Sequence, residues 1–541
     1  MKRIKKYFNF GSCVLVLGIL MLWCGEVSAN NLSISNATIT EQSTSAQTCK
    51  VQFDISWENS WRNGINYDAV WIFIKYSTDS GATWNHATLK TSGTNPSGFA
   101  QGTGTGLDVV VPTDKKGVFL QRSANNNAME TVSTTSVKLV WDWNADSLSA
   151  GDTIRLKVFG IEMVYIPTGS FYVGDGTNRT GGTNSHFFDA ADTTDSRDPV
   201  LISATQPYIS NVNDGTGTAG DITWVNESRS GNLPVARTQL NAGYPSGYNA
   251  FYSMKYEISQ GQYTDFLNSL TRTQQNTRTG TDVSTDTITN IYVMSNTSSI
   301  SYRNTLTCPS SGNGTINPII FSTTRPSRAC NYLAWMDLCA YEDWAALRPM
   351  TELEFEKACR GGQSVINGEY AWGNTTITNA TTISGTENGT ETITNSTANC
   401  CYNAIVFTDG DAGLGPLRCG IFATGSSTRQ SSGAGYYGAM ELSGNLWENV
   451  VSVMDSQAGT TISTFTCANG DGTLSTNGNA NTVNWPGLSG GEVTGASGSG
   501  FRGGAWVDFS SSESISDRDL ATYINVSHSS DGGGRCARTA P

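Results

Sequence analysis

Histidine is almost absent from this sequence, which contains only His86, His186 and His528. A non-haem iron centre needs several histidines close together, and these three are far apart along the chain. A Ser-His-Asp or Cys-His arrangement in the C-terminal part would have to use His186 or His528, and neither has supporting residues around it. The sequence therefore argues against a histidine-based iron site and against a histidine-dependent hydrolase.

Charged residues are also scarce, at 15% of the chain, and acidic residues outnumber basic ones by 46 to 33. The resulting net charge of −13 argues against nucleic acid and anionic membrane surfaces as partners. No C-x-x-C pair of the zinc-binding kind is present. The composition suits an acidic soluble or surface-attached protein able to bind calcium.

Long hydrophobic runs are missing after residue 29. Residues 1–29 carry basic residues at Lys2–Lys6, an apolar run at Val14–Trp23 and small residues before Asn30. This pattern predicts a secretory signal peptide cleaved after Ala29, so we expect an exported bacterial protein, secreted or at the cell surface, with no membrane span. Cleavage would remove four basic residues and one acidic residue, changing the net charge from −13 to −16. We expect disulfides among the ten remaining cysteines.

Residues 30–159 predict an all-β domain. Val51–Trp57 alternates apolar and polar residues, as half-buried strands do, and Val70–Tyr76 is apolar enough for a fully buried strand. Further strands are expected near Thr83–Leu89 and in four other segments: 107–111, 118–121, 137–143 and 154–158. Several short strands at regular spacing favour an immunoglobulin-like sandwich. We find no catalytic constellation in this domain.

Residues 160–541 predict a second domain of irregular α+β type. Ser259-Gln-Gly-Gln262 and Thr351-Glu-Leu-Glu354 are capping-box patterns that open helices, and a further helix is expected at 332–345. Residues 174–249 and 271–324 are expected to form loops. The Thr/Asn-rich segment Asn374–Thr397 is expected to be a surface insertion.

The stretch Gly435–Val451 reads G-Y-Y-G-A-M-E-L-S-G-N-L-W-E-N-V-V. Gly444 and Asn445 tolerate positive φ, so they permit a sharp turn between two short apolar runs. Glu441 and Glu448 bracket this turn. Two interpretations remain open from spacing alone: a site where carboxylates and carbonyls converge on a hard cation, or a structural turn with Trp447 in the core. The structural turn is the commoner outcome.

This stretch resembles the G-L-x-D-M-x-G-N-V-W-E-W signature of the formylglycine-generating enzyme, or sulfatase-modifying factor, superfamily. Further blocks match in the same order from about residue 161 to the C-terminus: Met163–Phe171, Tyr256–Tyr263, Arg348–Gly362, Tyr370–Gly373, Arg502–Trp506 and Arg535–Arg538. The resemblance implies a C-type-lectin-like fold for this domain. It does not by itself imply activity.

By this resemblance, one calcium ion would be held by Glu441 and Glu448 through side chains and by Gly444 and Leu446 through carbonyls. A second set implied by the resemblance is Asn399, the Cys400 carbonyl and either Asp411 or Asp409. The resemblance also implies a disulfide between Cys339 and Cys536.

The family's oxidase holds copper between two cysteines that lie two and seven residues after the aromatic residue of the R-G-G-S-W block. In this sequence those positions are Asp508 and Glu513, and no cysteine occurs between Cys467 and Cys536. Cuprous ion needs soft ligands, so we expect neither copper nor iron and predict that the oxidase activity is absent.

The segment after Trp506 combines short polar residues with a few aromatics, as adaptable recognition surfaces do. It is similar to the variable region of lectin-fold proteins diversified by retroelements; an ordinary solvated loop is the alternative. We therefore predict a non-catalytic protein that binds an unidentified ligand or surface protein, against the alternative of a divergent sulfatase-modifying oxidase or another enzyme on this fold. The predicted binding face comprises Trp506, Asp508, Phe509, Glu513, Asp517, Arg518, Tyr523 and His528.

Overall fold

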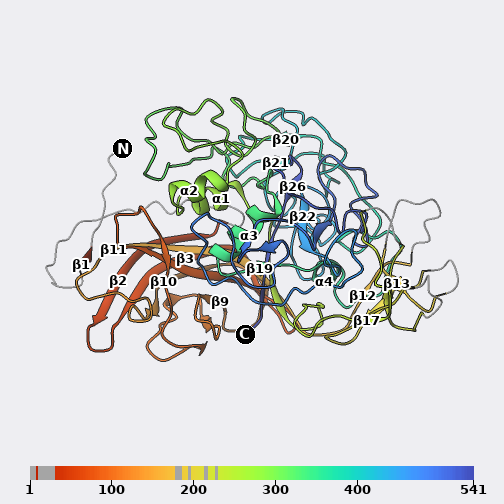
Figure 1. Cartoon of the computed structure of the whole chain (residues 1–541), viewed down its shortest axis with the longest axis horizontal. Coiled ribbons are helices and arrows are strands. Elements are labelled where there is room, and N and C mark those ends of the chain that lie inside the picture. The colour runs from red at the N-terminus through yellow and green to blue at the C-terminus, as the bar shows by residue number, and fades with distance from the viewer. Residues whose placement is uncertain (1–7, 10–30, 177–185, 193–196, 212–216, 226–228) are drawn as a thin grey trace.

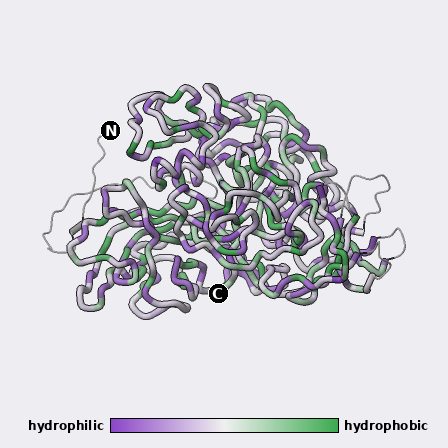
Figure 2. Tube along the Cα trace, viewed as in Figure 1, coloured by the Kyte–Doolittle hydropathy of each residue, from purple (hydrophilic) through white to green (hydrophobic). Residues whose placement is uncertain are grey.

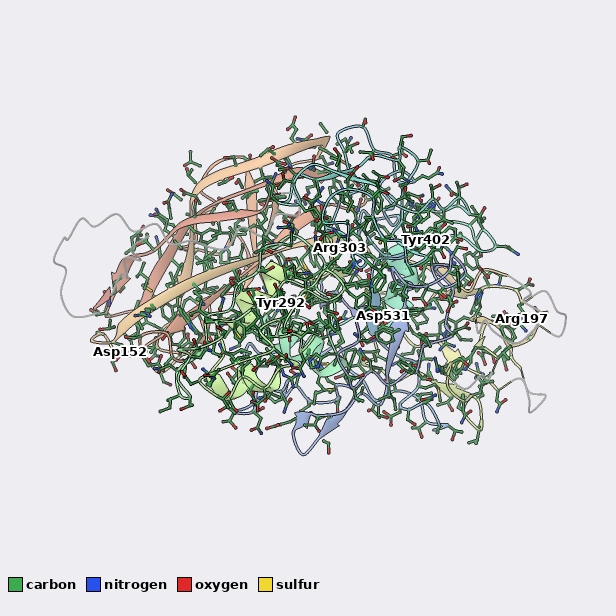
Figure 3. All side chains as sticks on the ribbon, turned by 90° about the horizontal axis from the view of Figure 1, so that it is seen from above. Asp152, Arg197, Tyr292, Arg303, Tyr402 and Asp531 are labelled. Atoms are coloured by element: carbon green, nitrogen blue, oxygen red, sulfur yellow. The ribbon has the colours of Figure 1, made fainter. Side chains whose placement is uncertain are left out.

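The computed structural model describes residues 8–9, 31–176, 186–192, 197–211, 217–225 and 229–541. The predicted signal peptide therefore lies outside the described residues, except for the short strand β1 (Phe8–Asn9). The fold is mostly β with a few short helices. The N-terminal strands occupy one end of an elongated molecule, and the short strands near β13 and β17 occupy the other (Figure 1). Figure 3 shows Asp152 and Arg197 at these two opposite ends.

Two sheets face each other in the N-terminal part. The first, in spatial order, consists of β2 (Ser33–Ser43), β3 (Thr48–Arg62), β10 (Asn126–Trp141) and β7 (Thr103–Gly104). The facing strands are β4 (Asp68–Ser77), β5 (Asn85–His86), β6 (Gly93–Thr94), β8 (Leu107–Val111) and β9 (Val118–Arg122).

Buried residues of both sheets form one core, which includes Val51, Trp57, Ile72, Leu120 and Trp141. Along β3, buried and half-buried residues alternate from residue 48 to residue 57, as the sequence pattern predicted. The return strand expected near Thr83–Leu89 shortens to the two residues of β5. β2 was not predicted. The immunoglobulin-like topology stays a prediction.

The large sheet does not stop at the predicted domain boundary. Its strand β11 (Thr153–Ile166) pairs with β4 and then with β18 (Phe251–Met254), so residue 160 lies inside a continuous strand. β27 (Cys536–Thr539) and β19 (Arg348–Pro349) extend the sheet beyond β18. On β4, the indole N–H of Trp71 donates to the carbonyl of Ala345 at 2.9 Å. The N-terminal and C-terminal parts are therefore joined by one sheet and a shared core.

Two helices begin at the predicted capping boxes. In α1 (Gln260–Leu267), the Ser259 hydroxyl accepts from the Gln262 N–H, and the Gln262 side chain accepts from the Ser259 N–H. Thr351 and Glu354 make the same pair of bonds at the start of α4 (Glu352–Arg360). These reciprocal bonds satisfy backbone donors that the first turn of a helix leaves without partners.

Of the two other helices in the described residues, one was predicted and one was not. α3 (Trp335–Trp344) lies inside the predicted segment 332–345. α2 (Arg272–Thr277) falls in a segment expected to form only loops. Thr271 and Gln274 form a capping box there as well, so the sequence carried a usable signal.

The other strands are short and lie between long loops. They are β12 (Phe171–Val173), β13 (Phe188–Asp189), β14 (Val200–Ile202), β15 (Tyr208–Ile209), β16 (Ile222–Thr223), β17 (Thr238–Gln239), β20 (Ile383–Ser384), β21 (Thr392–Ile393), β22 (Trp447–Val451), β23 (Leu488–Ser489), β24 (Glu492–Val493), β25 (Ser499–Arg502) and β26 (Gly532–Gly533). β22 pairs with both β25 and β26. This pairing brings the turn at Gly444 and Asn445, which we call the signature turn, next to the matching blocks Arg502–Trp506 and Arg535–Arg538.

The segment Asn374–Thr397 is not the simple surface insertion that its composition predicted. Ala380 and Ile383 are fully buried. Glu387 is also buried and pairs with Arg303 and Arg328. A few apolar and charged anchors therefore fix this Thr/Asn-rich segment against the domain.

Hydrophobic and hydrophilic stretches are short and interleaved along the chain (Figure 2). None of the helices in the described part of the chain has the length and hydrophobicity of a transmembrane segment.

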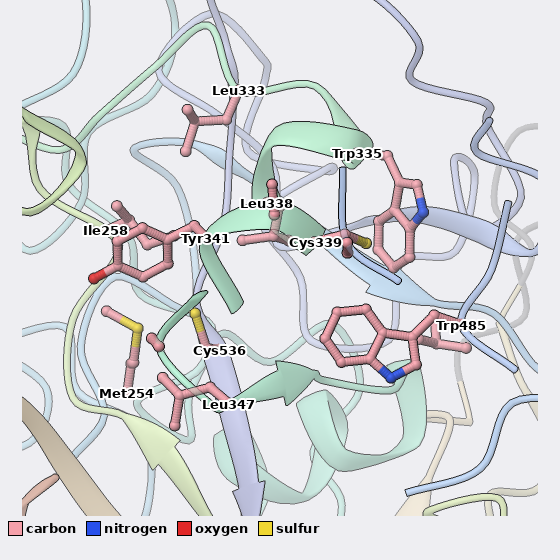
Figure 4. Close-up of a cluster of buried hydrophobic side chains, with 14 of the residues drawn as sticks. Met254, Ile258, Leu333, Trp335, Leu338, Cys339, Tyr341, Leu347, Trp485 and Cys536 are labelled. Carbon is pink, nitrogen blue, oxygen red and sulfur yellow. The ribbon is translucent and has the colours of Figure 1, made fainter. Parts of the chain in front are cut away.

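All ten cysteines of the described region are free, so the predicted Cys339–Cys536 disulfide is not formed. Both residues are fully buried in the core around α3. Figure 4 gives the reason: the Cys339 sulfur points towards Trp335, away from Cys536 on the neighbouring strand. The two thiols are therefore packed in the core as small apolar groups.

Candidate functional site

The signature turn is as sharp as its sequence predicted. Gly444 and Asn445 have φ values of 82° and 71°. A Cβ on Gly444 would lie 2.4 Å from the Sγ of Cys400, so only glycine fits. The Asn445 side chain accepts from the Leu417 N–H at 2.8 Å and donates to the Glu257 carboxylate, which also accepts from the Leu446 N–H at 3.0 Å. The turn is therefore held on both sides by buried hydrogen bonds.

Glu448, after the turn, is paired with an arginine. The Nε of Arg535 lies 2.8 Å from both carboxylate oxygens, and the guanidinium also donates to the carbonyls of Met254 and Met440. Glu448 and Arg535 are both almost completely buried. Burial raises the pKa of Glu448, and Arg535 opposes this shift. Such a desolvated bidentate pair positions β22 against the C-terminal strands.

Two further buried carboxylates surround this pair. Burial raises the pKa of Glu257 well above its ordinary value, and Glu441 and Glu448 add to the shift. Burial likewise raises the pKa of Glu441 to about 7. One oxygen of Glu441 accepts from the Gly420 N–H at 2.7 Å, and the other has no hydrogen-bond partner among the described residues. The cluster thus has three carboxylates around Arg535.

The first predicted calcium set fits this cluster only in part. Glu441 offers a free carboxylate oxygen, but Glu448 faces Arg535. Within the described ranges, no three His, Cys, Asp or Glu side chains are grouped so that they could hold a metal ion. Carbonyl oxygens are also calcium ligands, but the Gly444 carbonyl accepts from the Leu446 N–H at 3.1 Å. Calcium at this turn stays a prediction.

The oxygen atoms of the second predicted calcium set already have partners within the protein. The Asn399 side-chain oxygen accepts from the Thr378 N–H at 2.9 Å, and the Cys400 carbonyl accepts from the Ala380 N–H at 2.8 Å. Asp411 lies 2.9 Å from Arg328 and also pairs with Arg303. This set does not fit calcium as it stands, because the ion would have to displace these partners.

Calcium at the signature turn has a direct test. If the ion binds there, millimolar calcium should raise the melting temperature relative to excess chelator, because the unfolded chain has no such cage. Glu441→Gln should remove most of this increase, whereas Asp411→Asn should leave it. An equal melting temperature with calcium and with chelator would show that the turn is structural only.

The positions that hold copper in the family lie next to this turn. A Cβ on Gly444 would lie 3.3 Å from a carboxylate oxygen of Glu513, and a Cβ on Gly504 would lie 2.2 Å from the same oxygen. Glu513 is completely buried, and neither of its oxygens has a hydrogen-bond partner in the described structure. Burial, with repulsion from Asp508 and Asp517, raises the pKa of Glu513 well above its ordinary value.

These residues do not fit cuprous copper. Asp508 is half-buried, and burial raises its pKa to about 6. The thiol of Cys400 lies beside the same turn, but it donates to the Ser443 carbonyl at 3.2 Å, and burial raises its pKa well above the ordinary value. A soft cuprous ion requires thiolates, and this site offers two carboxyl groups and one protonated thiol.

The predicted binding face separates into buried and exposed residues. Phe509 is 74% exposed and Tyr523 is 39% exposed, so both are available for contact. His528 is half-buried at 3.0 Å from Asp337; burial opposes its protonation, but Asp337 raises its pKa above the ordinary value. Asp508 is half-buried. The other four, Trp506, Glu513, Asp517 and Arg518, are buried.

The prediction placed these four residues on one exposed face. Their burial shows that this part of the prediction was wrong. Arg518 pairs with Glu352 of α4 at 2.7 Å, and the Trp506 indole donates to the Ser530 carbonyl at 3.1 Å. The exposed large residues of the same segment are instead apolar: Val507, Phe509, Tyr523, Ile524 and Val526. We call these five residues the C-terminal patch.

Some residues of the site were missed. Glu257 and Arg535 were quoted only as parts of matching blocks, although they hold the signature turn. The position of Arg535 directly before a short apolar segment could have indicated its role, since a buried arginine needs a carboxylate partner. The contact of Cys400 with Gly444 joins residues 44 positions apart, and no local pattern indicates it.

One comparison with known proteins identifies a family. A family model described as the sulfatase-modifying factor enzyme 1-like domain matches residues 219–540, which is more than half of the chain. The search of curated proteins finds no match.

Proposed function

Because the chain belongs to the sulfatase-modifying factor family, we propose that it is a non-catalytic member that binds a ligand or a partner protein at or outside the cell surface. The proposal rests on one observation above all: buried carboxyl groups stand where the family's oxidase has its two copper thiolates. The C-type-lectin-like fold and the exported location are parts of the same proposal.

The replacement of the thiolates argues against the oxidase. Asp508 and Glu513 provide hard oxygen ligands, and the raised pKa of Glu513 favours its neutral form. Cys536 cannot take over, because it is buried within β27 in the core around α3. Oxidation of a substrate cysteine by oxygen needs a redox partner that these carboxyl groups do not supply.

The C-terminal patch supports binding. Phe509 and Val526 are 74% and 55% exposed, so their apolar side chains are available for contact. The guanidinium of Arg229 lies 5.0 Å from the ring centre of Tyr523, so the patch combines an aromatic, aliphatic side chains and a cation. Apolar anchors with short polar neighbours are typical of recognition surfaces.

Export is supported by the sequence pattern of residues 1–29 and by the acidic composition. A partner outside the cell would meet a protein with a net charge of −16 after cleavage at Ala29. Nucleic acid is a poor partner for such a surface.

The oxidase alternative is tested by a turnover assay. Mature protein loaded with copper, in air and with a thiol reductant, is incubated with a peptide that carries the sulfatase motif, and the aldehyde is sought by mass spectrometry. We expect no detectable product, because the soft ligands are missing. A working family enzyme serves as the positive control. Turnover that persists in Cys536→Ser and disappears in Asp508→Ala would overturn the proposal.

A further inference from the structure

A pocket opens where the N-terminal sheets meet the helices of the C-terminal part. It has a volume of about 40 Å³ and lies between β2, β4 and β11 on one side and α1 and α3 on the other. None of its residues belongs to the signature turn or to the C-terminal patch. We call it the seam pocket, because neither part of the chain forms it alone.

Aromatic rings form much of the wall of the seam pocket. Phe73 and Phe159 stack with ring centres 5.3 Å apart, and Trp344 meets them edge-on at 5.1 and 5.0 Å. Tyr341 completes the set, with its ring centre 5.6 Å from that of Trp344. All four side chains are at most 9% exposed, so neighbouring residues hold the rings rigidly. The faces of such rings attract cations.

One carboxylate also lines the seam pocket. Asp265 of α1 lines the seam pocket and is half-buried. Burial raises its pKa to about 6, and Lys157 opposes the shift, so the group is mostly ionised at neutral pH. The Lys157 ammonium donates to the Asn268 carbonyl at 3.0 Å and lies 4.4 Å from the ring centre of Trp84. It also lies 5.9 Å from the ring centre of Phe159, so Lys157 is a positive charge close to Asp265.

A second lysine lies against two of these rings. The Nζ of Lys75 lies 5.3 Å from the ring centre of Trp344 and 5.9 Å from that of Phe73. It is fully buried and donates to the Gly472 carbonyl at 2.7 Å. Burial lowers the pKa of Lys75 well below its ordinary value. Lys75 is not among the residues that line the seam pocket.

We propose that the seam pocket binds the head of a small alkylammonium ion. The aromatic walls solvate methyl or methylene groups and attract the positive charge, and Asp265 supplies the counter-charge. A volume of about 40 Å³ excludes a nucleotide or a sugar ring and admits only a compact head.

The test uses methylammonium and choline as probes, with methanol and 3,3-dimethyl-1-butanol as their neutral counterparts. Binding to the full mature protein is followed by titration calorimetry and by tryptophan fluorescence. At least one cation should bind with a Kd in the millimolar range, at least about tenfold more tightly than its neutral counterpart. Asp265→Asn should weaken binding by at least about fivefold, and Trp344→Phe should weaken it less.

Asp409→Asn is the matched control and should bind as the unmodified protein does. Circular dichroism and the melting temperature confirm that each variant is folded. Three results would overturn the proposal: no binding of either cation at 50 mM, equal binding of a cation and its neutral counterpart, or undiminished binding by folded Asp265→Asn.

Discussion

Replacing Arg535 by alanine is expected to lower the free energy of unfolding by about 3–5 kcal/mol. Arg535 is completely buried, and its Nε lies 2.8 Å from both oxygens of Glu448. Its loss leaves Glu448 desolvated beside Glu257 and Glu441, whose pKa values burial already raises. It also removes donors to the carbonyls of Met254 and Met440. Urea denaturation followed by fluorescence measures the change.

Two further variants show whether the unpaired charge causes the loss. Arg535→Met combined with Glu448→Leu should recover more than half of the lost stability, because the double replacement leaves no unpaired carboxylate. Lys90→Ala removes a surface ion pair with Asp142, in which the Lys90 side chain is 44% exposed, and should cost at most about 1 kcal/mol. A cost below about 1 kcal/mol for Arg535→Ala would contradict the role assigned to this pair.

Replacing Trp71 by alanine is expected to lower the free energy of unfolding by about 3–5 kcal/mol, through lost burial and the cavity left behind. Trp71 is completely buried on β4, next to Ile161 of β11 and Phe119 of β9. Its N–H donates to Ala345 at the end of α3. The measurement is thermal unfolding monitored by circular dichroism and calorimetry.

Because one sheet joins the N-terminal and C-terminal parts, Trp71→Ala should shift a single unfolding transition that involves both parts of the chain. Trp71→Phe keeps most of the ring packing and loses mainly the hydrogen bond, so it should cost about 1–2 kcal/mol. Two separate transitions, with only one of them affected by Trp71→Ala, would show that the parts fold independently.

Local patterns predicted the regular elements well. The capping boxes at Ser259 and Thr351 begin α1 and α4, because the side chains that satisfy the first turn lie within three residues of it. The alternation in Val51–Trp57 predicted β3 for an equally local reason. β2 was missed since its residues are mostly polar and half-exposed, and pairing with β3 specifies it instead.

The predicted binding face shows where local reasoning fails. Arg518 and Asp517 look like solvated charges in a polar segment, yet both are buried. Glu352, which binds Arg518, lies on α4, and the two residues are 166 positions apart. Only Phe509 and Tyr523 are exposed as the composition predicted, at 74% and 39%.

The sequence by itself determined the family, the carboxyl groups at Asp508 and Glu513, and the turn at Gly444, since each depends on residue identity or on short-range backbone preference. Only the tertiary structure decided that Glu448 faces Arg535, that Cys339 and Cys536 stay free, and that β11 joins both parts of the chain in one sheet. It also decided where the seam pocket lies. These features depend on segments that are far apart in the sequence and pack together in the fold. Burial favours those contacts, and no short stretch of sequence indicates them.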